Sequence, residues 1–379
     1  MLLADGRVDP TADNNWAFRL SSKKGHTDVV RLLLEDGRAD PTSDNNLAIQ
    51  LSCKNGHTDV VKLLLADGRA DPSASNNKCT RWNCNNWGGI SFLTGRPADP
   101  AAYGNNLAIQ LSSRNGHTDV VRLLLADGRA DPTANDSYAL QWSISFWHTD
   151  VVRLLLADAR VDPTLVVNGG VILLSSIMEN IGVMKLLLAD GRADPTVKDN
   201  FTIQYSSGRG DPEVVRLLLE DGRVDPAVDN NSAIRLSSKN GHTDVVRLLL
   251  ADGRVDPAAD NNSAIRWSCH FGHAEVVRLL LEDGRVDPTG DNNYTIRLSS
   301  KKGHTDVVRL LLADGRADPT ARDNWANRMS SSEGHTDVVQ LLLADGRADP
   351  AADNNVAIRM SSQNGHTDVV QLLLADDRC

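Results

Sequence analysis

The sequence lacks several features that would indicate a particular class of protein. Aromatic residues make up only 4% of its 379 residues, and no apolar run approaches the roughly 18 residues of a membrane span. Its five cysteines are an odd number without a common spacing, which is typical of a reducing compartment. The opening MLLADGRVDP has neither the basic nor the long apolar region of a signal peptide. We therefore expect a cytoplasmic protein, or a nuclear one, without a membrane span.

An excess of basic residues is also missing, since the formal net charge is -10. Nucleic acids and anionic membranes require basic patches on the proteins that bind them. The charge therefore excludes nucleic acid and membrane as the main partner. We interpret the acidic balance as a contribution to solubility.

The sequence is instead rich in internal repetition, which the stretch from Asp229 to Ala259 shows most clearly. It reads DNNSAIRLSSKNGHTDVVRLLLADGRVDPAA, and its central string GHTDVVRLLL recurs along the chain. The histidines of this string lie 31 residues apart at His242, His273, His304, His335 and His366, after earlier copies at His26, His57, His117 and His148. A period of about 20 to 50 residues indicates a solenoid of one repeated supersecondary unit.

Each repeat is predicted to consist of a helix, a tight turn, a second helix and a polar loop. A first helix is expected within Asn231–Asn240, ended by Gly241, because glycine takes the left-handed C′ conformation without a Cβ penalty. Thr243 is expected to cap the second helix, and Pro257 blocks helical continuation. The predicted apolar faces comprise Ala233, Ile234, Leu236, Ser237, Val245, Val246, Leu248, Leu249 and Leu250. Neither helix is long enough to be stable alone, so stacking on neighbours must stabilise both.

This repeat resembles the ankyrin repeat, whose most recognisable segment is the Gly-His-x-x-Val-Val-x-Leu-Leu-Leu string. Gly-Arg-Val-Asp-Pro is similar to the loop that leads into the family's β-hairpin finger. The resemblance covers essentially the whole chain. It implies an all-α ankyrin-repeat solenoid of about twelve stacked helix-turn-helix units with short connecting loops or fingers.

Two departures from the ankyrin pattern concern the loop and the start of the first helix. The period is two residues shorter than the family's usual repeat of about 33. The family's Thr-Pro-Leu-His is replaced by strings such as Ser232-Ala233-Ile234-Arg235, in which an Arg or Gln recurs from repeat to repeat. These departures bear on the geometry of the finger rather than on the fold.

We expect a single array over residues 1–379 without a separate catalytic domain. Repeats are regular in 1–72, irregular in 73–182 and mostly regular in 183–379. A third copy that loses its Gly-His string after Cys84 is expected to be the weakest joint of the stack, and Trp147 occupies a strained glycine position. The array starts within a repeat and ends on a second helix, so either the natural protein is longer or its end faces are tolerated or paired.

The residues that recur in every repeat are interpreted as structural. Neighbouring hinge histidines would lie about one helix-packing distance, roughly 10 Å, apart, which is too far to share a metal ion. Cys53 and Cys269 stand where other repeats have serine and are interpreted as packing residues. No nucleophile, base and orienting group occur together, so we predict no catalytic residue, no cofactor and no metal.

The residue after the Asn-Asn pair, which we name the variable slot, changes freely between repeats. The resemblance implies that this slot lies near a concave binding surface, where large apolar residues are candidate hot spots. The alternative is that each side chain tucks against the loop of the next repeat. The predicted partner-binding residues are Trp16, Leu47, Leu107, Tyr138, Phe201, Tyr294 and Trp325 from the slot, with Trp87 and Trp147 from the irregular region.

Two interpretations of the irregular region stay open. Eight of the sixteen aromatic residues lie between residues 73 and 150. They are either a binding centre or the product of drift in decaying copies.

The resemblance implies a non-enzymatic, monomeric scaffold that binds a protein partner through its concave loop and first-helix surface. Two other functions remain in competition. The chain is a repeat fragment or targeting array of a larger protein, such as an adaptor of a ubiquitin ligase or a kinase, or it is a purely structural spacer, which would have no partner.

Overall fold

The structure is a computed structural model that describes residues 9–74, 106–165 and 170–378. Within these ranges it contains 22 α-helices in stacked pairs, one short 3₁₀ helix and no strand. The predicted all-α repeat fold is confirmed. None of the described helices has both the length and the apolar character needed to cross a membrane.

The chain divides into two compact units, Met1–Val197 and Lys198–Cys379. The first unit contains α1 (Ala12–Lys24), α2 (Thr27–Asp36), α3 (Ser43–Asn55), α4 (Thr58–Asp67), α7 (Leu107–Arg114), α8 (Thr118–Asp127), α9 (Ala134–Ser145), α10 (Thr149–Ala157), η3 (Pro163–Leu165), α11 (Gly170–Ile177) and α12 (Ile181–Asp190). The second contains α13 (Val197–Arg209), α14 (Pro212–Asp221), α15 (Val228–Asn240), α16 (Thr243–Asp252), α17 (Ala259–Phe271), α18 (Ala274–Asp283), α19 (Gly290–Lys302), α20 (Thr305–Asp314), α21 (Ala321–Glu333), α22 (Thr336–Asp345), α23 (Ala352–Gln363) and α24 (Thr367–Leu374).

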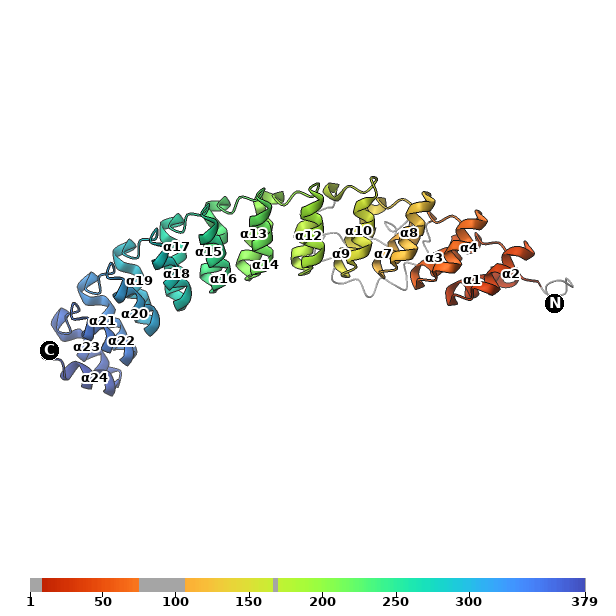
Figure 1. The fold of residues 1–379 in the computed structure, drawn as a ribbon. Helices are drawn as coiled ribbons and strands as arrows, with labels where there is room; N and C mark the ends of the chain where they lie inside the picture. Colours follow the sequence, from red (N-terminus) through yellow and green to blue (C-terminus); the bar gives the residue numbers. More distant parts are fainter. Residues whose placement is uncertain (1–8, 75–105, 166–169, 379) are drawn as a thin grey trace. The chain divides into compact units, whose positions relative to one another are not determined.

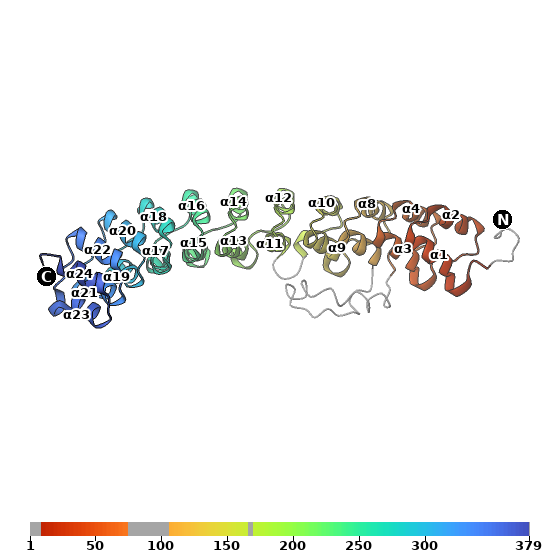
Figure 2. The same cartoon turned by 90° about the horizontal axis from the view of Figure 1, so that it is seen from below.

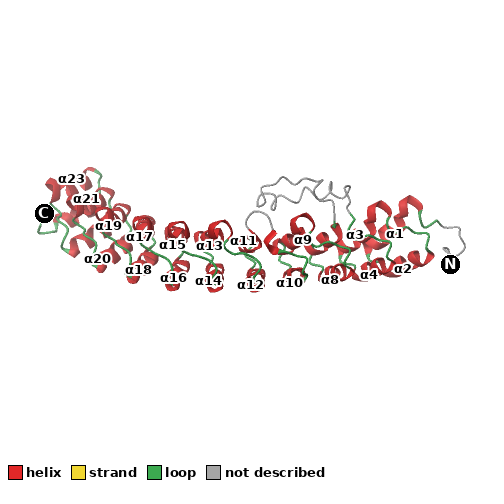
Figure 3. Ribbon diagram, turned by 90° about the horizontal axis from the view of Figure 1, so that it is seen from above, coloured by secondary structure: helices red, strands yellow, loops and turns green. Residues whose placement is uncertain are grey.

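Within each unit the odd-numbered first helices form one row and the even-numbered second helices form another (Figures 1 and 2). Within each unit, helices pack on their partner in the same repeat and on the equivalent helix of the next repeat, as α15 packs on α16 and on α17. Figure 3 shows that the green loops connect the two rows of red helices. Stability therefore depends on contacts between adjacent repeats.

The hinge between the two helices forms as predicted at the glycine but not at the threonine. Gly241 ends α15 with a φ of 78°, and the N–H of His242 donates to the Ser237 carbonyl over 2.9 Å. The second helix then begins at Thr243 itself, with His242 in the N-cap position and no side-chain cap bond. The predicted capping role of Thr243 is therefore wrong, because the hinge already satisfies the turn with backbone bonds.

Fewer residues of a repeat are buried than its apolar sequence pattern predicts. Val245, Val246 and Leu249 are buried, whereas Leu248 and Leu250 are only half-buried. In the first helix Ile234 is fully buried but Leu236 is 38% exposed. Two residues along a helix correspond to about 200° of rotation, so Leu236 lies opposite Ile234 and cannot share its core.

A left-handed turn lies at the start of most first helices, within the helix bounds given above, in place of the expected finger. Asp229, Asn230 and Asn231 have φ values of 48°, 55° and 61°, and no strand forms in the described part of the chain. Three successive residues in this region are costly for most side chains, and Asp and Asn tolerate it best. The turn explains why Asp-Asn-Asn occurs at this position in six repeats.

The repeats on either side of residues 75–105 are direct neighbours. The predicted third repeat, including Trp87, lies outside the described residues. Helix α3 packs on α7 and α4 packs on α8, and His117 donates from Nε2 to the Lys54 carbonyl over 2.9 Å. The prediction that the third repeat is the weakest joint falls on residues outside the described ranges and stays a prediction.

Candidate functional site

The hinge histidines connect each repeat to the one before it. His242 donates from Nε2 to the Gly208 carbonyl over 3.0 Å, and His273 does the same to the Lys239 carbonyl. The ring of His273 covers Gly241 so closely that a Cβ added at Gly241 would stand 2.6 Å from Nδ1. The structural interpretation of these histidines is confirmed. Among the described residues no group of three His, Cys, Asp or Glu side chains could hold a metal ion.

One exception to this hinge is the joint that follows Trp147. Trp147 takes the glycine position with a φ of 66°, and its side chain is 58% exposed. The next repeat has Asn180 instead of histidine, and the Asn180 side chain accepts a hydrogen bond from the Val183 N–H over 3.1 Å. The Cβ of a tryptophan fills the space that a histidine ring requires elsewhere, so the two departures belong to one joint.

The second asparagine of an Asp-Asn-Asn turn also binds the repeat that follows it, where the structure describes a following repeat. Asn231 accepts a hydrogen bond through Oδ1 from the N–H of Asp256 over 2.7 Å. The Asp-Gly-Arg triplet makes a third link, because Arg254 pairs with Asp252 over 2.7 Å and donates to the Val224 carbonyl over 2.8 Å. The hydrogen bond from Arg254 holds the pKa of Asp252 below its ordinary value. These recurrent polar residues therefore hold the stack together.

The Arg or Gln that departs from the ankyrin pattern caps the left-handed turn of its own repeat. Arg235 donates to the carbonyls of Asn230 and Asp229 over 2.9 and 3.0 Å, and Gln141 donates to the Asp136 carbonyl. Cys53 and Cys269 are fully buried, and burial raises the pKa of both thiols. Both cysteines are packing residues, as predicted.

All of the large aromatic side chains that are exposed in the described part of the chain lie on first helices or at the hinge directly after one. They are Trp16, Phe146, Trp147, Phe201, Trp267 and Phe271. We define the first-helix face as the exposed side of the odd-numbered helices. It carries the variable slot and the residues four and eight positions after it.

The structure places the residues of the variable slot at different depths. Trp16 and Phe201 are exposed, and Leu107 is buried, as are Ser232 and Ser263. Half-buried positions are held by Leu47, Tyr138, Tyr294 and Trp325. The slot lies at the border between the first-helix face and the following repeat, so side-chain size and neighbours decide its exposure.

The family of the chain follows from its repeats. The family described as ankyrin repeats in three copies matches residues 2–76, 172–261 and 251–323, which together exceed half of the chain. The single ankyrin repeat matches residues 104–137 and 328–355. The chain belongs to the ankyrin-repeat family. No curated relative matches it.

One similar solved structure is the crystal structure of EF0377, an ankyrin repeat protein. It is 23% identical, and the match covers 46% of this chain and 97% of that chain with a TM-score of 0.41. Ankyrin repeats are generally protein–protein interaction modules and typically non-catalytic, and no enzyme domain is identified beside them.

An aromatic cluster on helix α17 was not predicted from the sequence. It consists of Trp267, His270 and Phe271, and we name it the α17 cluster. The Trp267 and Phe271 rings stack with centroids 6.0 Å apart, and the His270 ring meets Phe271 edge-on at 4.7 Å. The Lys239 ammonium lies 5.4 Å from the Trp267 centroid. The available signal was the position four residues after the slot, which holds leucine in regular repeats and tryptophan here.

Two residues of the variable slot form a second aromatic group, on α19 and α21. The Arg266 guanidinium lies 4.8 Å from the centroid of Tyr294, and that of Arg297 lies 5.9 Å from the same ring. Arg297 also lies 5.4 Å from the centroid of Trp325. Cations and aromatic rings therefore alternate along this part of the first-helix face.

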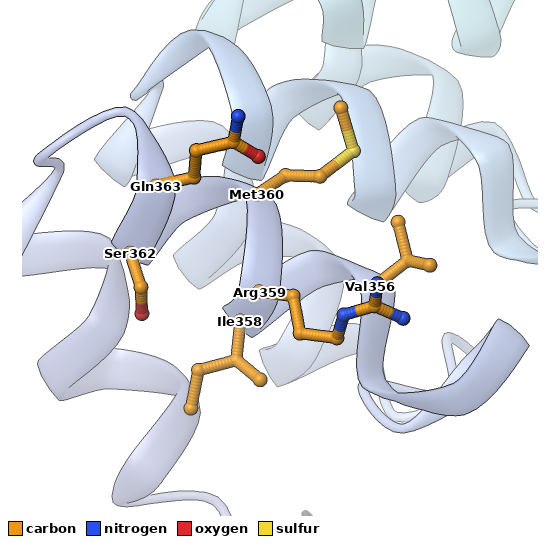
Figure 4. Close-up of a pocket in the computed structure, with 6 residues that line it drawn as sticks. All are labelled: Val356, Ile358, Arg359, Met360, Ser362 and Gln363. Atoms are coloured by element: carbon orange, nitrogen blue, oxygen red, sulfur yellow. The ribbon is translucent and has the colours of Figure 1, made fainter.

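An open hollow of about 760 Å³ lies along α23. It is lined by Val356, Ile358, Arg359, Met360, Ser362 and Gln363. Figure 4 shows Met360 and Gln363 on one side of the helix and Ile358 and Ser362 on the other. Arg359 is the single charged side chain of this lining. The hollow has no paired acid and base and does not resemble a catalytic site.

Proposed function

We propose that this ankyrin-repeat chain is a non-enzymatic scaffold that binds a protein partner through its first-helix face. One observation carries the proposal. Every large exposed aromatic side chain of the described residues lies on that face or at its edge. Exposed aromatic residues are the most frequent anchors of protein interfaces, and apolar patches on soluble proteins mark interaction sites.

The second-helix row has the opposite character. Its exposed side carries ion pairs within single helices, such as Arg278 with Glu275 and Glu282 at 2.6 and 2.9 Å. Exposed pairs of this type contribute little and keep a surface solvated. The two rows therefore differ in a way that suits partner binding on the first-helix face and solvent on the other.

The variation between repeats supports the same proposal. The hinge histidine, the turn asparagine and the Asp-Gly-Arg triplet make the same bonds in repeat after repeat. The residues of the first-helix face differ between repeats although their backbone is the same. A fixed backbone with varied side chains lets specificity be placed residue by residue.

The test is capture of partners from native cells by the chain and by two matched variants. Trp267→Ala with Phe271→Ala removes side chains that are 42% and 44% exposed on the first-helix face. We expect capture to fall by about tenfold or more, as for the loss of an interface anchor, with an unchanged melting temperature.

The control is Leu32→Ala, which removes an exposed apolar side chain from the second helix α2. It should leave capture unchanged. Equal capture by all three proteins would contradict the proposal. So would the absence of any partner, which a structural spacer predicts, or a fall in melting temperature that explains the loss of capture.

A further inference from the structure

A series of ion pairs joins the first helices of adjacent repeats. The arginine three residues after the variable slot pairs with the first residue of the next left-handed turn. Arg19 meets Asp44 at 2.9 Å, Arg235 meets Asp260 at 3.0 Å and Arg266 approaches Asp291 at 4.0 Å. Arg328 pairs with Asp353 in the same way. The partners lie 25 residues apart in sequence, so the series follows the stacking of the repeats.

The series breaks at the joint between α19 and α21. The residue 25 positions after Arg297 is Arg322, where the neighbouring repeats have Asp291 and Asp353. Arg297 therefore faces a second cation instead of a carboxylate. In the part of the chain that the structure describes, neither Arg297 nor Arg322 forms an ion pair, and Asp323 beside Arg322 forms none with them.

Burial makes the unpaired charge of Arg297 expensive. Its residue is only 6% exposed, and its guanidinium donates to the carbonyls of Asn292 and Asp291 over 2.8 and 3.0 Å. Burial first, and then repulsion from Arg322, lowers its pKa from the ordinary value, and the smaller attraction of Asp291 opposes this shift. A buried cation that lacks an ion pair and is repelled by a second cation is costly, and such costs are concentrated at binding sites.

Two aromatic rings flank the Arg297 guanidinium. Tyr294 and Trp325, the variable-slot residues of α19 and α21, lie 5.9 and 5.4 Å from the Arg297 guanidinium. Both rings are half-buried, while Arg322 is exposed. Arg322 therefore presents an exposed cation whose charge acts on Arg297, and Arg297 itself lies between two aromatic rings.

We propose a binding site for an aspartate or glutamate side chain of a protein partner, formed by Arg297, Arg322, Tyr294 and Trp325. The proposal rests on the first-helix face being the binding surface, and it names the chemistry of one contact there. The partner carboxylate takes the place of the aspartate that this joint lacks. Bidentate pairing of carboxylates with guanidinium groups gives both strength and direction to such a contact.

The local charge favours a carboxylate over a phosphate. Relative to the neighbouring repeats, Arg322 replaces an aspartate and Asp323 replaces an asparagine, so the joint gains one net positive charge. One carboxylate neutralises this excess, whereas a phosphate dianion would exceed it. A polyanion such as nucleic acid would also meet the chain's net charge of -10.

The test uses immobilised pools of nine-residue peptides with randomised flanks and a fixed central residue, which is Glu, Gln, phosphoserine or Lys. We expect the chain to retain the Glu pool about tenfold more than the Gln pool, as for a charge-assisted contact. Arg322→Asp restores the aspartate of the neighbouring repeats, so it should abolish this preference without lowering the melting temperature. Arg309→Asp changes the charge equally on the second helix α20 and should keep the preference.

Equal retention of the Glu and Gln pools would overturn the proposal, as would a preference for phosphoserine over Glu or retention of no pool. A preference for Glu that survives Arg322→Asp would place the carboxylate-binding site elsewhere and would also overturn the proposal. Trp267→Ala with Phe271→Ala should lower the retention of all pools without changing the ratio of Glu to Gln. Failure of the first-helix face as a binding surface is therefore distinguished from failure of the carboxylate-binding site at Arg297 and Arg322.

Discussion

At the scale of single residues, the hinge glycine of one repeat and the histidine of the next form one structural element. A Cβ at Gly241, Gly272 or Gly303 would stand 2.6 to 2.7 Å from Nδ1 of the following histidine. Real Cβ atoms do not approach so closely, so the histidine ring requires glycine below it as well as a left-handed backbone. Trp147 and Asn180 mark a joint where both residues have changed together.

A double-mutant cycle at this joint tests the coupling. Trp147→Gly should stabilise the chain by about 1 kcal/mol, because glycine adopts the left-handed conformation without strain. Asn180→His alone should destabilise it, since the ring meets the Trp147 Cβ and the cap on Val183 is lost. In the Trp147→Gly background the same change should be neutral or stabilising. The measurement is the free energy of unfolding of all four proteins.

The expected coupling is about 1–3 kcal/mol. Additive effects of the two substitutions would contradict the shared role of glycine and histidine. Gly272→Ala and Gly365→Ala provide an internal comparison, because both glycines have a φ of 78° but only Gly272 has a histidine against it.

At the scale of elements, the left-handed turn at the start of a first helix is stabilised by hydrogen bonds to residues outside the turn. Three consecutive left-handed residues cost roughly 1–2 kcal/mol each for ordinary side chains. The turn persists because its asparagine binds the next repeat, as Asn262 accepts from the Asp287 N–H over 2.7 Å. The Arg or Gln of the following helix caps its carbonyls, as Arg297 does for Asn292.

Asn262→Ala tests this dependence, with Asn355→Ala as its matched control. Both asparagines have the left-handed conformation, with φ values of 57° and 61°, so the intrinsic cost of alanine is shared. Of these two asparagines, only Asn262 accepts a hydrogen bond from another repeat in the described part of the chain. We expect Asn262→Ala to lower the free energy of unfolding by about 1 kcal/mol more than Asn355→Ala. Faster amide exchange at Asp287 should accompany the loss, and equal effects would contradict the link.

At the scale of the whole chain, the Asp-Gly-Arg pairs make the free energy of unfolding depend on pH. The pKa values of Asp67, Asp127, Asp190, Asp252, Asp283, Asp314 and Asp345 are all lowered, chiefly by the hydrogen bond from the arginine two residues later. A carboxyl group with a lowered folded-state pKa contributes stability above its unfolded pKa. That contribution is lost as the pH falls through the folded-state value.

The melting temperature should therefore be nearly constant above about pH 5 and fall below about pH 4, where the unfolded aspartates titrate. Replacing Arg254, Arg285, Arg316 and Arg347 with glutamine removes the positive charges that lower four of these pKa values. The variant should be less stable at neutral pH and lose less on acidification. Thermal unfolding of both proteins across this pH range measures the difference. If the two plots of melting temperature against pH are parallel, the Asp-Gly-Arg pairs are not the source of the pH dependence.

The candidate site was only partly predictable from the sequence. Trp16 and Phe201 are exposed in the variable slot, whereas Leu107 is buried in the same slot. The α17 cluster was missed because the residue four positions after the slot is usually leucine, which is typical of a core. Leu236 shows the reason, since it faces outward although the apolar pattern includes it. A pattern of hydrophobic residues does not state how wide the buried face is.

The sequence by itself determined the repeat, the helix pair, the hinge glycine and the membership of the ankyrin family. These features depend on periodicity and on backbone preferences that act over a few residues. The tertiary structure alone decided which carbonyl each histidine binds, which asparagine holds the next turn and where the series of ion pairs breaks at Arg297. Such contacts join residues 25 to 34 positions apart, so they exist only once adjacent repeats have packed.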